Sequence, residues 1–144
     1  MYFKNILVPY DGSDFSKKAF KIALDLAQKY ESKISIVICI PKHYSSSWYV
    51  DNRISDLNFK KQYKAAKTES SKLESEAKKL DISLSSTILD TTNISKTLVD
   101  YAKSHKTDLI IIGSHGKSGW DKLVLGSVAN GVLQRSECNV LLIK

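Results

Sequence analysis

Residues 109–127 read LIIIGSHGKSGWDKLVLGS, an apolar run followed by a glycine-rich segment. The run at 109–112 is short, β-branched and uninterrupted, which is typical of a buried strand in a parallel sheet. Gly126-Ser127 then indicates the start of a helix. The stretch therefore predicts a strand, a loop and a helix in succession, and the rest of the fold can be built around it.

The glycine-rich segment has the chemistry of an anion-binding loop. Glycines let the backbone adopt positive φ and approach a ligand closely. Successive backbone N–H groups in such a loop form a concavity that binds anions. The helix N-terminus at Gly126-Ser127 would add a second group of free amides. Two such groups suit a polyphosphate better than a single carboxylate, although a turn without any ligand is the alternative interpretation.

Two common nucleotide-binding motifs are excluded. A P-loop requires a glycine five residues before the glycine of its Gly-Lys-Ser end, and that position holds Ile111 rather than glycine. A dinucleotide fingerprint requires G-x-G-x-x-G at the opening of a helix, and no such pattern occurs.

The rest of the chain alternates between strand and helix patterns. Further strands are predicted over 4–9, 33–40, 82–89 and 139–143. Helices are predicted after Ser13 or Asp14, over 59–80, after Asn93 and from Ser127. This alternation predicts one α/β domain over 1–144, with an open, doubly wound, Rossmann-like parallel sheet and helices on both faces. Right-handed connections and a single reversal then give five strands in the order 3-2-1-4-5.

This strand order places Asp11 near the glycine loop. The carboxyl ends of the first and fourth strands are neighbours at the reversal, where open α/β sheets bind ligands. Those ends carry Asp11 and Gly113. Asp11 either shapes an Asx-turn or binds a ligand, and its position alone does not decide between the two.

The segment 41–58 shows no regular pattern, and we expect an irregular flap or a surface for a partner. Trp48 within it packs either on a ligand or on the body of the protein. The helix that follows has a one-sided apolar stripe, which we expect to lie on the sheet. The stripe consists of Phe59, Tyr63, Ala66, Leu73, Ala77 and Leu80. Residues 90–93 are expected to form a turn.

Composition limits the classes of function. The net charge is +7 and the pI is about 9.3, but the lysines are spread along the chain and mixed with acidic residues, so nucleic acid is an improbable partner. Two cysteines and three histidines lack the spacing of a metal site. No apolar run approaches the ~20 residues that span a membrane. With no signal peptide visible after Met1, a cytoplasmic location is expected.

The glycine spacing resembles the nucleotide-binding motif of the universal stress protein family. The match consists of Gly113, Gly116 and Gly126-Ser127, and the opening segment 9–13 with Ser16 also resembles that family. The family's Gly-x-Pro near residues 90–93 is missing here. The Ser-Gly-Gly-x-Asp-Ser loop of the related ATP pyrophosphatases is also absent, which argues against their chemistry.

The resemblance implies that the chain binds ATP or another adenine nucleotide, with Mg²⁺ or Mn²⁺ held through the phosphates and no metal site of its own. The implied binding residues are Pro9, Tyr10, Asp11, Ile40, Gly113, Ser114, His115, Gly116, Lys117, Gly126, Ser127 and Val128. In the family the aspartate contacts the ribose, and the residue matching Ile40 bonds the adenine through its backbone.

The expected roles around the phosphates are specific. Amides of Gly116, Lys117 and Ser127 are expected near the phosphates, and Gly113 would let the base and ribose approach. Ser114 and His115 would shape the loop. The Lys117 side chain either neutralises phosphate charge or is an exposed lysine.

The resemblance also implies a homodimer through the edge of the last strand, Val140 to Ile143. The function expected is a nucleotide-dependent stress-response module without dedicated catalysis. Two alternatives remain open. One is a slow ATPase or phosphotransferase switch, for which only His115, Asp121 and Asp11 could supply a base. The other is a homodimeric interaction protein that holds no nucleotide.

Overall fold

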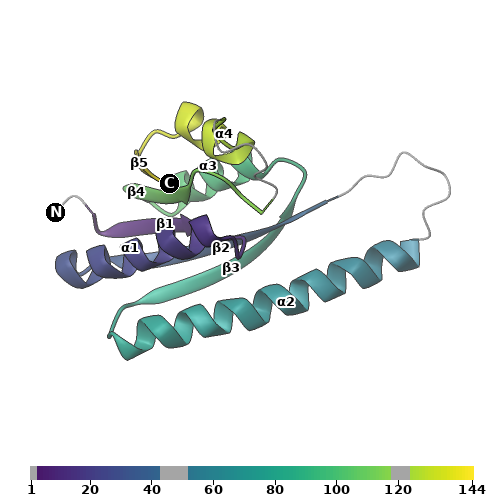
Figure 1. Cartoon of the computed structure of the whole chain (residues 1–144), viewed down its shortest axis with the longest axis horizontal. Helices are drawn as coiled ribbons and strands as arrows, with labels where there is room; N and C mark the ends of the chain where they lie inside the picture. Colours follow the sequence, from purple (N-terminus) through teal and green to yellow (C-terminus); the bar gives the residue numbers. More distant parts are fainter. Residues whose placement is uncertain (1–2, 43–51, 118–123) are drawn as a thin grey trace.

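The computed structural model describes residues 3–42, 52–117 and 124–144. These residues form one five-stranded sheet and the helices that cover it (Figure 1). The strands are β1 (Asn5–Pro9), β2 (Lys33–Pro41), β3 (Leu84–Thr91), β4 (Leu109–Gly113) and β5 (Asn139–Ile143). The helices are α1 (Asp14–Tyr30), α2 (Asn52–Lys79), α3 (Ile94–Ser104) and α4 (Ser127–Arg135).

The strand order is β3-β2-β1-β4-β5, and every pair is parallel, as predicted. β1 is central and pairs with β2 from Asn5 to Pro9 and with β4 at Ile6 and Leu7. The order reverses between β1 and β4, because the chain adds β2 and β3 on one side of β1 and then β4 and β5 on the other. The carboxyl ends of β1 and β4 therefore lie next to each other at the reversal.

Two helices cover each face of the sheet. α1 and α2 lie on one face and α3 and α4 on the other (Figure 1). Alternate residues of a strand point to opposite faces, so Ile6 and Val8 pack with α1 and α2 whereas Leu7 packs with α3 and α4. All three are buried. Burial on both faces explains why the central strands are unbroken apolar runs rather than alternating patterns.

Helix α1 begins where its sequence predicts. Ser13 has extended backbone and its hydroxyl accepts a hydrogen bond from the Ser16 amide, so it is the N-cap. The helix ends at Glu31, which is left-handed with φ 55°. One face of the helix packs on the core, with Phe20 and Ala23 among its buried residues.

Strands β2 and β3 end later along the chain than predicted, and β3 also begins two residues later, at Leu84. β2 continues through Pro41, and β3 continues to Thr91, where a turn over 90–93 was expected. Pairing explains the difference, because Ile40 and Pro41 lie opposite Asp90 and Thr91 and the Lys42 amide donates to the Thr91 carbonyl. The predicted ends of these two strands, at Ile40 and Leu89, were therefore wrong.

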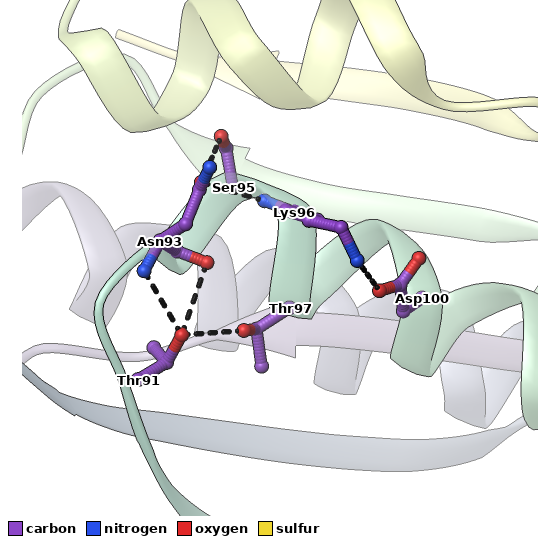
Figure 2. Close-up of polar contacts among 6 residues, drawn as sticks. All are labelled: Thr91, Asn93, Ser95, Lys96, Thr97 and Asp100. Atoms are coloured by element: carbon purple, nitrogen blue, oxygen red, sulfur yellow. Dashed lines mark hydrogen bonds and ion pairs between the residues drawn. The ribbon is translucent and has the colours of Figure 1, made fainter.

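Helix α3 is anchored to the end of β3 by short polar side chains (Figure 2). Asn93 is the N-cap, and its side-chain oxygen accepts from the Lys96 amide at 3.2 Å. The Thr91 and Thr97 hydroxyls are 2.7 Å apart, and Lys96 pairs with Asp100 one turn later. The expected turn is therefore reduced to two residues between strand and helix.

Helix α2 starts earlier than predicted, and less of its apolar stripe is buried than expected. It begins at Asn52, within the segment 41–58 that was expected to be irregular; residues 43–51, which include Trp48, lie outside the described residues. The middle of the expected stripe is buried, as at Ala66 and Leu73, but Phe59, Tyr63 and Leu80 are exposed. The helix spans ~42 Å and β3 only ~26 Å. The N-terminal end of α2 extends past the sheet, whereas its C-terminal end, where Ala77 is buried, lies beside the start of β3 (Figure 1).

Candidate functional site

The predicted meeting of Asp11 with the glycine loop is present. The Lys117 amide donates a hydrogen bond to Oδ2 of Asp11 at 3.2 Å, across 106 positions of sequence. A Cβ atom at Gly116 would lie 2.8 Å from the same oxygen. The carboxylate that follows β1 therefore lies directly on the loop that follows β4, and a side chain at Gly116 would displace it.

The other Asp11 oxygen forms the Asx-turn that was the alternative interpretation. Oδ1 accepts from the Ser13 amide at 2.9 Å, and Gly12 between them has φ 81°, a conformation that disfavours side chains. The side chain of Asp11 is exposed. The two interpretations are thus compatible, because one oxygen shapes the turn and the other faces the glycine loop.

Gly113 has a packing role that was not predicted. A Cβ atom at Gly113 would lie 2.6 Å from Cβ of Phe15 and 3.3 Å from the amide of Ser16. The missing side chain therefore lets α1 pack closely on the end of β4. The expected role of Gly113, to let the base and ribose approach, stays a prediction beside this packing role.

Ser114 and His115 hold the start of the loop, as expected. The buried Ser114 donates its amide to the Ile143 carbonyl at 2.7 Å, and its hydroxyl is 2.9 Å from Nδ1 of His115. Nε2 of His115 contacts the Val124 carbonyl. Because a carbonyl only accepts, Nε2 carries the proton, and Nδ1 accepts from the Ser114 hydroxyl. The imidazole thereby bridges the two ends of the segment 114–124.

Among the residues that the structure describes, no side chain caps the N-terminus of α4. Gly126 occupies the N-cap position and makes no side-chain hydrogen bond, whereas Ser13 and Asn93 cap α1 and α3. The Gly126 amide donates to the Ser114 carbonyl at 2.9 Å, and a Cβ atom there would lie 2.9 Å from that oxygen. The first-turn amides, beginning at Ser127, therefore retain the partial positive charge of a helix N-terminus beside the loop.

Tyr10 points its side chain away from the loop. The ring is buried and packs edge-on against Phe20, and the hydroxyl donates to Oε1 of Glu69 on α2 at 2.9 Å. Burial, followed by the hydrogen bond to Glu69, raises the pKa of the Tyr10 phenol above its ordinary range. Only the backbone of Tyr10 is available to a ligand at the carboxyl end of β1.

The remaining predicted residues fall into two groups. Pro9 and the buried Ile40 belong to neighbouring central strands, close to the reversal of the sheet. Ser127 and Lys117 are exposed at the loop, and Val128 is half-buried. The Lys117 side chain lies over the turn at Gly12, where an added Cβ would be 3.4 Å from Nζ. The Lys117 ammonium group therefore lies close to the turn that carries Asp11.

Sequence reasoning missed Phe15 and Glu69. Phe15 packs against Gly113 and places its ring 5.3 Å from that of His115, and Glu69 holds Tyr10. An apolar residue in the first turn of α1 was the available signal for Phe15. Asp121, considered as a base, lies outside the described residues.

Among the described residues, no group of three or more His, Cys, Asp or Glu could hold a metal ion. The cysteines Cys39 and Cys138 are free thiols. No helix in the described part of the chain has the length and hydropathy needed to cross a bilayer.

The fold defines an α/β protein with a doubly wound sheet and a glycine-rich loop that contacts Asp11 at the switch point. The sequence model of the universal stress protein family matches residues 2–144, so the chain belongs to this family. A universal stress protein of Methanocaldococcus jannaschii is 28% identical over 148 residues, covering 99% of this chain and 82% of that protein.

Solved structures show the same fold. Universal stress protein UspA from Lactobacillus plantarum superimposes with a TM-score of 0.85 at 26% identity, covering 100% of this chain and 99% of its own. Two more distant structures hold nucleotides. One universal stress protein is in complex with cAMP (TM-score 0.73, 22% identity, coverage 99% and 98%), and one from Archaeoglobus fulgidus is in complex with dAMP (TM-score 0.71, 20% identity, coverage 100% and 100%).

Proposed function

We propose that this universal stress protein binds an adenine nucleotide, ATP in particular, at the carboxyl ends of β1 and β4. The observation that carries the proposal is the uncapped N-terminus of α4, which adjoins the glycine loop that touches Asp11. Free amides at a helix N-terminus and in a glycine loop favour phosphate. The family members in complex with cAMP and dAMP support an adenine nucleotide as the ligand.

Each part of the nucleotide has suitable partners in this arrangement. The first-turn amides of α4 and the loop amides near Lys117 suit the phosphates, and the Lys117 ammonium group would neutralise charge. The Asp11 carboxylate accepts hydrogen bonds, which suits ribose hydroxyls. The backbone at Ile40 would bond the adenine. Two separate groups of amides favour a polyphosphate over a monophosphate, and this favours ATP over AMP.

The metal that accompanies ATP would be held through its phosphates. Mg²⁺ usually keeps several waters and is bound by few protein carboxylates plus substrate phosphates. Asp11 is the exposed carboxylate nearest the loop in the described part of the chain, and both of its oxygens already accept amides. Mg²⁺ or Mn²⁺ bound directly by the triphosphate therefore fits the residues present.

The biological role proposed is a nucleotide-dependent regulatory module in the cytoplasm, acting as a homodimer. β5 is an edge strand of the sheet, and Leu141 on it is 38% exposed. An apolar edge strand is prone to pair with another chain unless something covers it. Pairing of Val140 to Ile143 with the same strand of a second copy would cover this edge.

The proposal is tested by identifying the nucleotide that the protein carries. Freshly purified protein is denatured, and the released small molecules are identified by chromatography and mass spectrometry. Titration with Mg-ATP by calorimetry follows. Gly116→Val should abolish both signals, because its Cβ and methyl groups would enter the space of the Asp11 carboxylate. Gly131→Ala is the matched control, since its added Cβ would meet Ser95 of α3 instead.

Release of ATP or ADP from the wild type and from Gly131→Ala, with none from Gly116→Val, would support the proposal. Release of ADP would also make timing of hydrolysis worthwhile. If the wild type releases no nucleotide and millimolar Mg-ATP produces neither heat nor a change in melting temperature, the proposal is wrong. An interaction protein without nucleotide would then explain the fold best.

A further inference from the structure

The Asp11 carboxylate accepts a hydrogen bond from a backbone amide that the phosphates would need, that of Lys117. Its Oδ2 accepts the Lys117 N–H at 3.2 Å, and it lies 2.8 Å from the position that a Cβ of Gly116 would take. Both are positions of the glycine loop that the proposed function assigns to phosphate. A carboxylate is an anion with the same preference for loop amides as a phosphate oxygen. The loop therefore already holds an anion supplied by the chain itself.

We propose that Asp11 determines specificity by closing the phosphate end of the site to free anions until a ribose draws its carboxylate away. This inference rests on the proposed nucleotide binding and deepens it. Its ligand class is ribonucleosides with attached phosphates, as opposed to inorganic phosphate, pyrophosphate or tripolyphosphate alone.

The physical basis is competition for one carboxylate. An incoming polyphosphate meets the negative charge of Asp11 and finds the Lys117 amide already bonded. Ribose hydroxyls are donors, so they offer the carboxylate new partners in place of that amide. The Oδ1 bond to Ser13 at 2.9 Å keeps the carboxylate anchored on the turn while Oδ2 changes partner. The freed amide then faces the phosphate.

This competition makes the ribose and phosphate halves of the site cooperative. A nucleoside that binds Asp11 releases the amide, so a polyphosphate binds more tightly afterwards, and the reverse holds by linkage. The coupling can be measured with the two halves as separate molecules. We expect adenosine at saturation to tighten tripolyphosphate binding about tenfold, which is within the usual range of coupled sites.

The experiment titrates tripolyphosphate by calorimetry at fixed ionic strength, with and without saturating adenosine. The control ligand is 2′,3′-dideoxyadenosine, which has the base but no ribose hydroxyls and should give no enhancement. Asp11→Ala should bind tripolyphosphate about tenfold more tightly than the wild type without adenosine, because the amide is free, and should show no enhancement. It should also bind ATP more weakly, having lost the ribose contact.

The matched control for charge is Asp14→Ala. Asp14 is an exposed carboxylate in the first turn of α1, three positions from Asp11. Removing it changes the local charge equally without freeing a loop amide, so tripolyphosphate affinity should stay near that of the wild type. An equal gain in Asp14→Ala and Asp11→Ala would overturn the inference, because general electrostatics would then explain both.

A second readout covers the case that Asp11→Ala folds poorly. Asp11→Asn keeps the shape and can satisfy only one of the two amides with its single oxygen. In ¹⁵N-labelled wild type, adenosine should shift the Lys117 amide resonance and dideoxyadenosine should not, and Asp11→Asn should remove that response. If ATP binds the wild type but adenosine changes neither this resonance nor tripolyphosphate affinity, the inference fails and the proposed function stands. If ATP does not bind at all, both fail.

Discussion

Tyr10 and Glu69 join the carboxyl end of β1 to helix α2 through a hydrogen bond of 2.9 Å between the phenol and Oε1. The two residues are 59 positions apart in sequence. Tyr10 immediately precedes Asp11, so this bond ties the residue before Asp11 to α2. The buried ring also packs edge-on against Phe20 of α1.

The raised pKa of Tyr10 predicts a loss of stability at high pH. The phenol of the folded protein stays protonated above the pH at which the unfolded chain ionises, because of burial and the bond to Glu69. Its contribution to the free energy of unfolding is therefore complete below about pH 10 and declines above it. Tyr10→Phe should cost about 1 kcal/mol near pH 8, and this cost should shrink by roughly 1 kcal/mol near pH 10.5. Urea denaturation at both pH values measures the change.

Tyr63→Phe is the control for this prediction, because Tyr63 is an exposed tyrosine of α2. Its substitution should leave the free energy of unfolding and its pH dependence within a few tenths of a kcal/mol of the wild type. A difference between Tyr10→Phe and wild type that stays constant with pH would contradict the role assigned to Tyr10.

Gly131 in α4 is needed for the contact with α3. A Cβ atom there would lie 2.6 Å from Oγ and 2.7 Å from Cβ of Ser95. Gly131→Ala gains helix propensity but overpacks this contact, so we expect a net loss of about 1–2 kcal/mol and a melting temperature lower by roughly 3–6 °C. Thermal unfolding followed by circular dichroism gives the value.

The double variant Gly131→Ala with Ser95→Gly tests the cause. Removing the Ser95 side chain removes both close contacts, so the alanine should become less costly than it is in the wild-type background. If the cost of Gly131→Ala is the same in both backgrounds, the contact with Ser95 is not its origin.

Much of the fold followed from local patterns, and the misses have physical causes. The unbroken apolar runs predicted β1 and β4 because these strands are buried on both faces. The strand order then predicted that Asp11 lies near the glycine loop that begins at Gly113. The extension of β3 to Thr91 depended on pairing with β2, which local sequence does not encode. The exposure of Phe59 depended on where the sheet ends relative to α2, which helical periodicity cannot show.

The candidate site likewise has features that the sequence predicted and features that depend on tertiary structure. Asp11 was placed correctly by topology, and its contact with the Lys117 amide could not have been inferred, because it depends on the path of the loop. The packing role of Gly113 was missed for a related reason. A glycine signals a close approach but not its partner, which is Phe15.

The exposed edge of β5 predicts a dimer that a single charge should disrupt. Leu141→Lys places an ammonium group on the edge that the second copy would cover, and a buried unpaired charge is costly. We expect sedimentation velocity at micromolar concentration to give a dimer for the wild type and a monomer for Leu141→Lys. Leu57→Lys is the matched control, since Leu57 of α2 is 65% exposed and lies on a different element. A wild-type monomer at this concentration would contradict the proposed dimer.

Cys39 on β2 should react slowly with alkylating reagents in the folded protein. Burial raises the pKa of its thiol to about 11. The thiolate is the reactive form. Near neutral pH, the fraction of Cys39 present as thiolate should be on the order of 100-fold lower in the native protein than in the unfolded chain. The measurement is the rate of iodoacetamide labelling by mass spectrometry in a Cys138→Ser background, native and in urea. Similar rates in the two states would mean that β2 opens to reagent readily, which would contradict its place between β1 and β3 in the sheet.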